Sequence, residues 1–143
     1  MAGYPSPVLI TGAGSELAQG LRARLEARGV SCFMACRSEK SLLACRGKGQ
    51  AAALLTHPED LPELCREALG SGPEGLADFQ HSPFESLLSQ ASPSAIEEWA
   101  AGDIALRARV LRALSRSMLA RRRDRGLFIS SAAADRPAPG QGF

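Results

Sequence analysis

The stretch ITGAGSELAQGLRARLEARG, residues 10–29, has the residue types of a loop that holds a phosphate group. Gly12 and Gly14 would let backbone N–H groups approach an anion without a Cβ in the way, and the helix expected next would add a partial positive charge at its N-terminus. Glu16 is unexpected there, because its carboxylate would repel a bound phosphate unless the side chain turned outward. Two glycines after a strand are a weak signal, since any tight strand-to-helix turn would use them.

The cysteines and histidines lack the spacing of a metal or catalytic site. Four cysteines, at positions 32, 36, 45 and 65, form no C-x-x-C pair and have no histidine at ligand spacing. We therefore expect free, buried or half-buried thiols and no zinc. His57 and His81 are isolated in polar segments, where a solvated histidine is the expected state.

Composition limits the size and the setting of the protein. The chain has 143 residues, of which 45% are apolar and 22% are charged, as expected for one soluble domain. Its formal charge of +2 predicts no nucleic-acid partner. The basic run ARRRDRG, residues 120–126, leaves nucleic-acid binding as an alternative, but its cations also suit the C-terminal end of a helix. With no secretory signal and no apolar run near the roughly 18 residues that span a bilayer, a cytoplasmic location is expected.

Short apolar runs alternate with helical patterns along the chain. Strands are predicted at residues 7–11, 30–36, 51–55, 75–79 and 126–132. Amphipathic patterns predict helices at residues 15–28, 39–45, 57–70 and 94–123. Because parallel strands need helical crossovers, this alternation predicts an α/β fold with a doubly wound parallel sheet. The ligand of such a sheet lies beyond the carboxyl ends of its strands, over the turn after the first strand.

Several segments resemble the short-chain dehydrogenase/reductase family, in the correct order from Val8 to Phe143. Residues 11–29 resemble its T-G-x-x-x-G-[IL]-G loop and first helix, and ACRSEKSL, residues 35–42, resembles the end of its second strand. Three further segments match later helices and the fifth strand: HPEDLPEL, IEEWAAGDIALRARVLRAL and GLFISSAAADRPAPGQG. The resemblance implies a partial Rossmann-like dinucleotide-binding domain over residues 1–143, closest in style to NADP-dependent 3-oxoacyl-carrier-protein reductases.

The resemblance also implies which residues hold the cofactor. The implied contacts come from Thr11, Gly12, Gly14, Ser15, Leu17, Arg37, Ser38 and Leu55. Arg37 and Ser38 match the pair that binds the 2′-phosphate in NADP-preferring members, and a guanidinium is a good bidentate partner for phosphate. The alternative for Arg37 is an ordinary surface arginine at a strand end.

Departures from the family pattern remove cofactor contacts. Glu16 and Ala18 replace the second and third loop glycines, Leu54 replaces an adenine-contacting Asp, and ADFQHSPF stands in place of N-N-A-G. NADP binding is therefore expected to be weakened. Asp103 matches the structural Asn, with an acceptor but no amide donor, and Ser131 matches the serine that binds the substrate carbonyl.

The family's chemistry is hydride transfer between a nicotinamide and a carbonyl or alcohol carbon, with a tyrosine as acid/base and a lysine four residues later. No Y-x-x-x-K follows Ser131 in this chain, and the single tyrosine, Tyr4, precedes the first strand. One hypothesis is a reductase of ketones, such as carrier-bound 3-oxoacyl groups, whose Tyr/Lys segment is supplied separately.

The other hypothesis is a non-catalytic, degenerate subunit that pairs with an active reductase through the helix at 103–123. That helix has two apolar stripes, which suggest two packing partners. One contains Ile104, Ala108, Leu111 and Met118, and the other contains Leu106, Val110 and Ala113. The fifth strand is also expected to form an apolar edge that a homo- or hetero-oligomer would cover.

Overall fold

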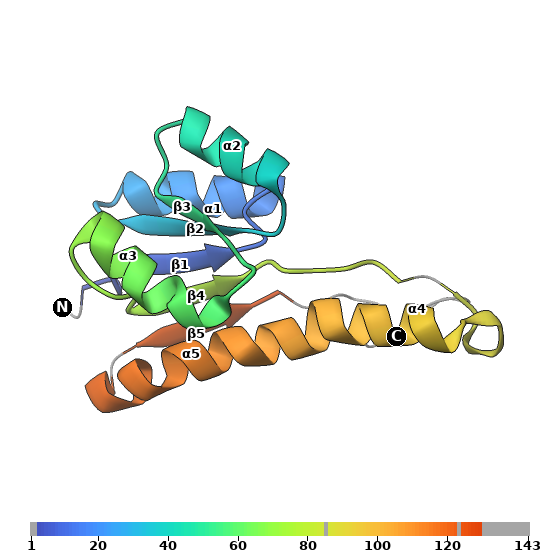
Figure 1. Ribbon diagram of the computed structural model, residues 1–143. Helices are drawn as coiled ribbons and strands as arrows, with labels where there is room; N and C mark the ends of the chain where they lie inside the picture. Colours follow the sequence, from blue (N-terminus) through green and yellow to red (C-terminus); the bar gives the residue numbers. More distant parts are fainter. Residues whose placement is uncertain (1–2, 85, 123, 130–143) are drawn as a thin grey trace.

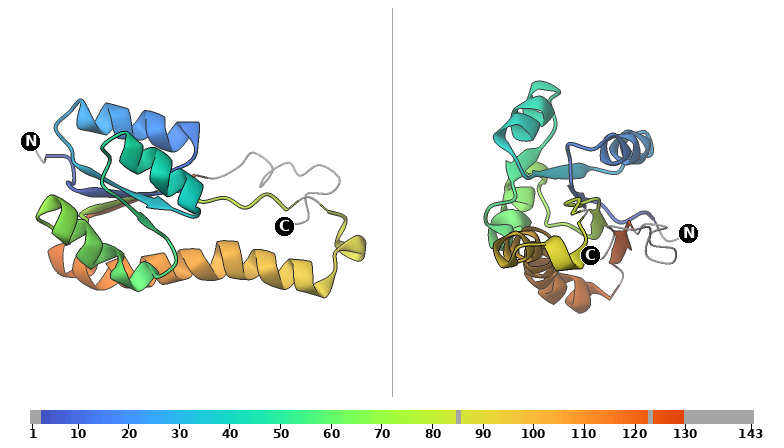
Figure 2. Two further views of the ribbon diagram at one scale, coloured as in Figure 1. Left: turned by 45° about the horizontal axis from the view of Figure 1, so that its top comes forward. Right: turned by 90° about the vertical axis from the view of Figure 1, so that its right-hand side faces the viewer.

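A computed structural model describes residues 3–84, 86–122 and 124–129, which form a parallel sheet covered by helices on both faces (Figure 1). The strands are β1 (Val8–Thr11), β2 (Cys32–Cys36), β3 (Ala52–Leu54), β4 (Gly75–Asp78) and β5 (Arg125–Phe128). Helices α1 (Glu16–Glu26) and α2 (Glu39–Gly47) lie on one face, and α3 (Leu61–Leu69) and α5 (Leu106–Arg121) lie on the other (Figures 1 and 2). The predicted α/β fold is confirmed.

The strand order is β3-β2-β1-β4-β5, so the direction of winding reverses between β1 and β4. Register places Thr11, the last residue of β1, between Ala35 of β2 and Asp78 of β4. The loops that follow β1 and β4 therefore leave the same edge of the sheet on opposite sides of a crevice, where ligands of such sheets bind.

Each face of the sheet has its own apolar core. Alternate side chains of a strand point to opposite faces, so Ile10 and Met34 pack under α1 and α2 while Leu9 and Phe33 pack under α3 and α5. All the residues of β1 and β2 are buried, as expected for the central strands of a sheet that is covered on both sides.

Serine caps begin the helices that flank the crevice. The Ser15 hydroxyl accepts a hydrogen bond from the backbone N–H of Ala18 at the start of α1, and the Ser38 hydroxyl does the same for Ser41 at the start of α2. A 3₁₀ turn, Pro58–Asp60, precedes α3, which ends at Gly70 with φ of 83°. The predicted helix at 57–70 is thus confirmed with a later start.

The predicted helix at 94–123 is one rod with an irregular middle. It consists of α4 (Pro93–Trp99), a π-helical turn at Ala100–Ala105 and α5, and Figure 2 shows it extending past the sheet. A short 3₁₀ turn, Leu88–Gln90, comes before it. The π-helical turn contains Asp103, and such turns often occur at functional sites.

Only one of the two predicted stripes on α5 packs against the sheet. Val110 and Leu114 are buried there, and Met118 packs beside them, so assigning Met118 to the other stripe was wrong. Ile104 and Leu111 are exposed.

The edge strand β5 is also exposed, with Leu127 and Phe128 each at 48%, which leaves the apolar edge that the sequence predicts.

All four cysteines are buried free thiols, as predicted. Burial raises the pKa of Cys32 and of Cys65 to about 11, and raises that of Cys36, which faces Cys45, to about 12. Within the described residues there is no group of side chains that could hold a metal ion. None of the described helices combines the length and apolar character that crossing a membrane requires.

Candidate functional site

The two glycines of the loop after β1 lie close to neighbouring segments, and packing requires glycine at position 12. Gly12 has φ of 66°, and a Cβ there would lie 2.5 Å from the carbonyl oxygen of Phe79. A Cβ on Gly14 would lie 2.8 Å from the Ser41 hydroxyl oxygen. The loop is therefore held tightly between the end of β4 and the first turn of α2.

Backbone donors remain available at the start of α1. The Ser15 N–H donates to the Gly12 carbonyl, and the Ser15 hydroxyl accepts a hydrogen bond from the N–H of Ala18. Among the described residues nothing accepts from the N–H groups of Gly14, Glu16 and Leu17. Three free donors at the positive end of a helix dipole match the chemistry of a pyrophosphate, so the loop fits a dinucleotide.

The Glu16 side chain does not line the space beside this loop. Glu16 is the first residue of α1, its side chain is exposed, and it lines neither of the hollows described below. A carboxylate in the first turn of a helix also interacts favourably with the helix dipole. Ala18, which stands where the family has its third glycine, is fully buried against the sheet.

A groove runs across the carboxyl ends of the strands and consists of two adjoining hollows. The first, of about 220 Å³, is lined by residues 12–15 of the loop together with Arg37 and Ser41. The second, of about 530 Å³, is lined by Leu17, Asp103, Arg107 and Ile129. Four residues line both hollows and join them: Ser15, Phe79, Gln80 and His81.

Arg37 lies at the outer end of the first hollow. It follows β2 directly, its side chain is exposed, and its Nη1 donates to the Ser82 hydroxyl at 2.5 Å. Its Nη2 would lie 3.3 Å from a Cβ placed on Gly102. The guanidinium is thus held beside the groove by the segment after β4 rather than extended into solvent.

Three other predicted cofactor residues, Thr11, Ser38 and Leu55, do not line the groove. Ser38 caps α2, and its hydroxyl is shared with the backbone and side chain of Ser41. The side chain of Leu55 is 4% exposed and packs in the core beneath α3 and α5, so it does not reach the groove. Thr11 is 1% exposed and contributes through a buried hydrogen bond to Asp78 rather than by facing the groove.

A buried polar network forms the floor between the two halves of the sheet. The Asp78 carboxylate accepts from the Thr11 hydroxyl, from the Gln80 N–H at 3.1 Å and from Arg107 Nε at 2.5 Å. Arg107 Nη2 also donates to the Gln80 carbonyl at 2.5 Å. Arg107 therefore ties α5 to the end of β4.

Asp103 lines the second hollow from the π-helical turn. It is 6% exposed, and its Oδ2 lies 3.8 Å from Arg107 Nη1. Its Oδ1 and the Oε1 of Gln80 are buried, and neither has a hydrogen-bond partner among the residues that the structure describes. Unpaired buried acceptors are costly unless a ligand or water supplies a donor. Ser131, the other predicted catalytic residue, lies outside the described residues.

Sequence reasoning missed four residues of the site: Asp78, Gln80, His81 and Arg107. The spacing of four residues between Asp103 and Arg107 is the one local signal, since such pairs meet on one helix face. His81 is exposed, as expected from the sequence, and it also lines both hollows. Tyr4 precedes the amino end of β1, at the opposite edge of the sheet from this groove.

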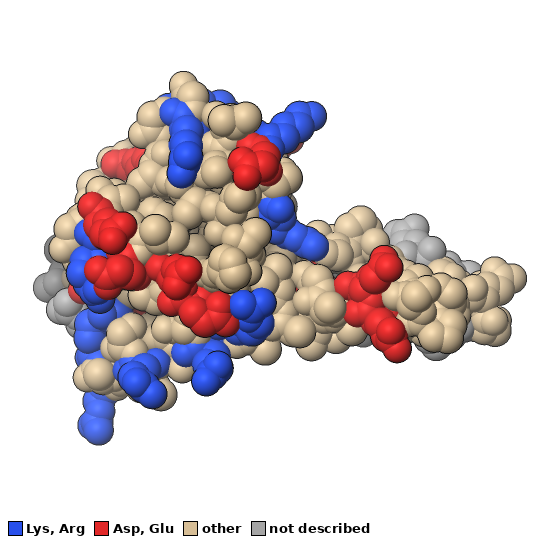
Figure 3. Space-filling view, in the orientation of Figure 1, with Lys and Arg blue, Asp and Glu red and all other residues tan. Residues whose placement is uncertain are grey.

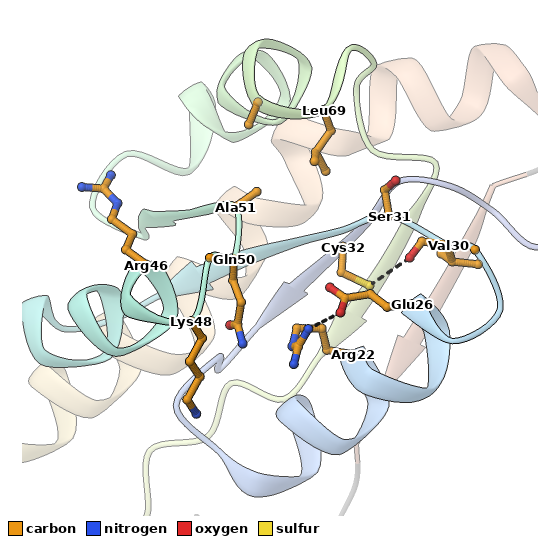
Figure 4. A pocket seen from close by; sticks show the side chains of 13 residues that line it. Arg22, Glu26, Val30, Ser31, Cys32, Arg46, Lys48, Gln50, Ala51 and Leu69 are labelled. Carbon is orange, nitrogen blue, oxygen red and sulfur yellow. Dashed lines mark hydrogen bonds and ion pairs between the residues drawn. The ribbon is translucent and has the colours of Figure 1, made fainter.

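The largest hollow described, about 850 Å³, lies at the opposite edge of the sheet (Figure 4). It lies between α1, α2 and the residues that lead into β2 and β3, with Arg22 paired to Glu26 at one side. Ligands of doubly wound sheets bind at the carboxyl ends of strands, so this hollow is not the cofactor site.

Charged side chains form no single-sign surface on the face that Figure 3 shows, where basic and acidic groups are interspersed. Arg121 of the basic run ends α5, pairs with Asp124 at 2.6 Å and donates to the Pro73 carbonyl at 2.5 Å. This structural role favours the helix-end explanation of the run over nucleic-acid binding.

Comparison with known proteins gives structural matches only. No protein-family model and no curated protein matches the sequence. A short-chain dehydrogenase/reductase from Vibrio parahaemolyticus is similar at 24% identity and a TM-score of 0.73, covering 94% of this chain and 62% of its own. An NADPH-bound short-chain oxidoreductase from Pseudomonas aeruginosa PAO1 with an atypical catalytic centre is similar at 17% identity and a TM-score of 0.79. The match includes 94% of this chain and 58% of the oxidoreductase.

An NAD⁺-bound xylitol dehydrogenase is also similar, at 18% identity and a TM-score of 0.77, covering 95% of this chain and 56% of its own. The chain therefore has the fold of the short-chain dehydrogenases/reductases, and it spans between 55% and 62% of the length of four such structures. The resemblance stated from sequence is confirmed at the level of the fold.

Proposed function

We propose that this chain is a short-chain dehydrogenase/reductase domain whose groove binds NADP(H). The continuous groove beyond β1, β2 and β4 carries this proposal, since it joins free backbone donors at the start of α1 to a guanidinium at one end. That two of the similar structures are bound to NADPH and to NAD⁺ supports a nicotinamide cofactor.

The chain's own residues suggest how the dinucleotide would be held. The N–H groups of Gly14, Glu16 and Leu17 would bind the pyrophosphate, and Arg37 would bind the 2′-phosphate of the adenosine half. The Ser15 hydroxyl stays committed to its cap, so it positions the loop rather than the ligand. Such a cofactor supplies hydride transfer when bound.

The proposed reaction is reduction of a ketone or oxidation of an alcohol, and it depends on a Tyr/Lys pair from outside this chain. The chain itself contributes the cofactor groove and, at its inner end, Asp103. We infer that this domain binds cofactor but shows no reductase activity by itself. Its one tyrosine, Tyr4, precedes β1 at the opposite edge of the sheet, so it cannot serve as the acid/base in the groove.

Arg37 provides the test of cofactor identity. Wild-type protein should bind NADPH more tightly than NADH, measured by the fluorescence of the nicotinamide. Arg37→Ala should weaken NADPH binding by about ten- to a hundredfold and leave NADH binding unchanged, because only NADPH has the phosphate that a bidentate guanidinium would hold.

Arg46→Ala is the matched control, because Arg46 is an exposed arginine of α2 that lines the hollow at the opposite edge of the sheet. It should bind both cofactors as the wild type does. If Arg37→Ala lowers the affinity for NADPH and for NADH equally, Arg37 does not bind the 2′-phosphate. A folded wild-type protein that binds neither cofactor would refute the proposed function.

A second candidate function is that of a subunit that pairs through its exposed apolar surface. Ile104 and Leu111 on α5 are 54% and 39% exposed, and Leu127, Phe128 and Ile129 at the β5 edge are about half exposed. Exposed apolar side chains gathered on one helix and a neighbouring edge are typical of protein–protein contacts. The partner would be a second copy of this chain or a related reductase.

The mass of the purified protein in solution tests the case of a second copy. Light scattering should give a dimer, and Leu111→Glu should raise the dissociation constant by about tenfold or more, because a carboxylate would be buried in the contact. Leu43→Glu, on the exposed side of α2, is the control and should leave the mass unchanged. A wild-type monomer would exclude self-pairing.

A further inference from the structure

The inner end of the groove carries more negative than positive charge. Asp78 and Asp103 are both buried, and among the described residues Arg107 is the one basic side chain that pairs with them, at 2.5 Å and 3.8 Å. Two carboxylates and one guanidinium leave a formal charge of −1. The groups in this network are poorly hydrated, so solvent screens their charges less than it screens charges on the surface.

Several donors at this end already bond to other groups of the protein. Arg107 donates Nε to Asp78 and Nη2 to the Gln80 carbonyl, and the Gln80 amide donates to the Gly102 carbonyl at 3.0 Å. Within the part of the chain that the structure describes, two buried acceptors remain without a partner, Asp103 Oδ1 and Gln80 Oε1. A group that carries positive charge or N–H donors would complement this lining, whereas a neutral, donor-poor group would not.

The remaining residues of the inner hollow do not offset this charge. Leu17, Phe79 and Ile129 are apolar, and Ser15 is uncharged. His81 is exposed, so solvent screens any charge it carries. Arg37 lies at the far end of the groove, in the first hollow, and pairs with Ser82.

We propose that the inner hollow selects the oxidised cofactor, so that the protein binds NADP⁺ more tightly than NADPH. This rests on the proposed function: if Arg37 holds the 2′-phosphate, the nicotinamide end of the dinucleotide lies toward Asp103 and Gln80. The oxidised ring has a positive charge and the reduced ring has none, so Asp103 and Asp78 stabilise the first form only. Both forms have a carboxamide N–H₂ that can donate to the free acceptors.

Calorimetric titration of the full chain with NADP⁺, NADPH and 2′-phospho-ADP-ribose tests this proposal. The last probe has the adenosine half and the pyrophosphate but no nicotinamide. NADP⁺ should bind about tenfold more tightly than NADPH. The increase in affinity over 2′-phospho-ADP-ribose should therefore be larger for NADP⁺ than for NADPH. This comparison uses the wild-type protein and needs no variant.

Asp103→Asn removes the charge and keeps the shape of the side chain. It should bring the NADP⁺ and NADPH dissociation constants to within about twofold of each other, and leave that of 2′-phospho-ADP-ribose unchanged. Glu98→Gln is the control, because it removes a carboxylate from the exposed surface of α4, outside the groove. It should keep the preference, and circular dichroism should show that both variants are folded.

The outcomes separate this inference from the proposed function. Binding of all three probes with equal constants for NADP⁺ and NADPH, or tighter binding of NADPH, overturns the charge selection and leaves the cofactor site intact. A preference for NADP⁺ that persists in folded Asp103→Asn overturns it as well. Binding of none of the probes to folded protein overturns the proposed function, and this inference with it.

Discussion

Arg107→Ala should lower the free energy of unfolding by about 3 kcal/mol, because it would leave the buried Asp78 carboxylate without its ion-pair partner. The side chain of Asp78 is 5% exposed and that of Arg107 is 32% exposed. Because Arg107 is only partly buried, the expected loss of stability is at the lower end of the range for broken buried ion pairs. Urea denaturation followed by circular dichroism measures the change. The variant should also lose affinity for the cofactor, since the residue ties α5 to the floor of the groove.

Arg109→Ala is a demanding control, because Arg109 lies two residues further along the same helix and also pairs with a carboxylate. Its partner Glu59 accepts two hydrogen bonds, at 2.8 and 2.9 Å, and these hold the pKa of Glu59 down at about 2. Whatever the pair contributes is therefore complete at neutral pH and is lost as the pH falls toward 2.

Both partners of this control pair are exposed, however, so solvent screens the interaction and little change in stability is expected. Equal effects of Arg107→Ala and Arg109→Ala would contradict the special role given to the buried network.

Gly12→Ala should destabilise the protein by about 2–4 kcal/mol through two separate effects. Alanine is strained at φ of 66°, and its Cβ would lie 2.5 Å from the Phe79 carbonyl oxygen, which is backbone that cannot move without shifting the end of β4. Thermal unfolding measures the loss. The same variant should weaken NADPH binding, because Phe79 and Gln80 line both hollows of the groove.

Gly20→Ala tests the same substitution in an open place. Gly20 lies in α1, and a Cβ there would meet nothing within 4 Å. Alanine should stabilise this helix by about 0.5–1 kcal/mol, because glycine loses more backbone entropy on folding. The two variants should therefore move the melting temperature in opposite directions. A tolerated Gly12→Ala would show that the loop has more room than its packing indicates.

The two hypotheses drawn from the sequence concern different surfaces of the molecule and can both hold. Cofactor binding depends on the groove at the carboxyl ends of the strands, whereas pairing depends on α5 and the β5 edge. The prediction that Glu16 weakens cofactor binding stays a prediction; its side chain is exposed and does not line the groove.

The sequence by itself determined the fold, because local patterns were strong along most of the chain. Apolar runs such as VLIT and CFMAC are too short for helices, and the periodic segments between them have caps at Ser15 and Ser38. Alternation of these elements leaves a parallel sheet as the consistent arrangement. The glycine loop, Arg37 and Asp103 could also be selected, because the resemblance placed them at known points of that fold.

Only the tertiary structure decided which side chains face the groove. Leu55 was predicted to contact the cofactor, yet it points into the core, since neighbouring residues of a strand lie on opposite faces and the sequence alone does not show which face a given residue takes. Asp78, Gln80 and Arg107 come from segments up to 29 residues apart, and their network exists only because β4 and α5 pack together. Apart from the four-residue spacing of Asp103 and Arg107, no local pattern in the chain specifies this network, because it depends on long-range contacts.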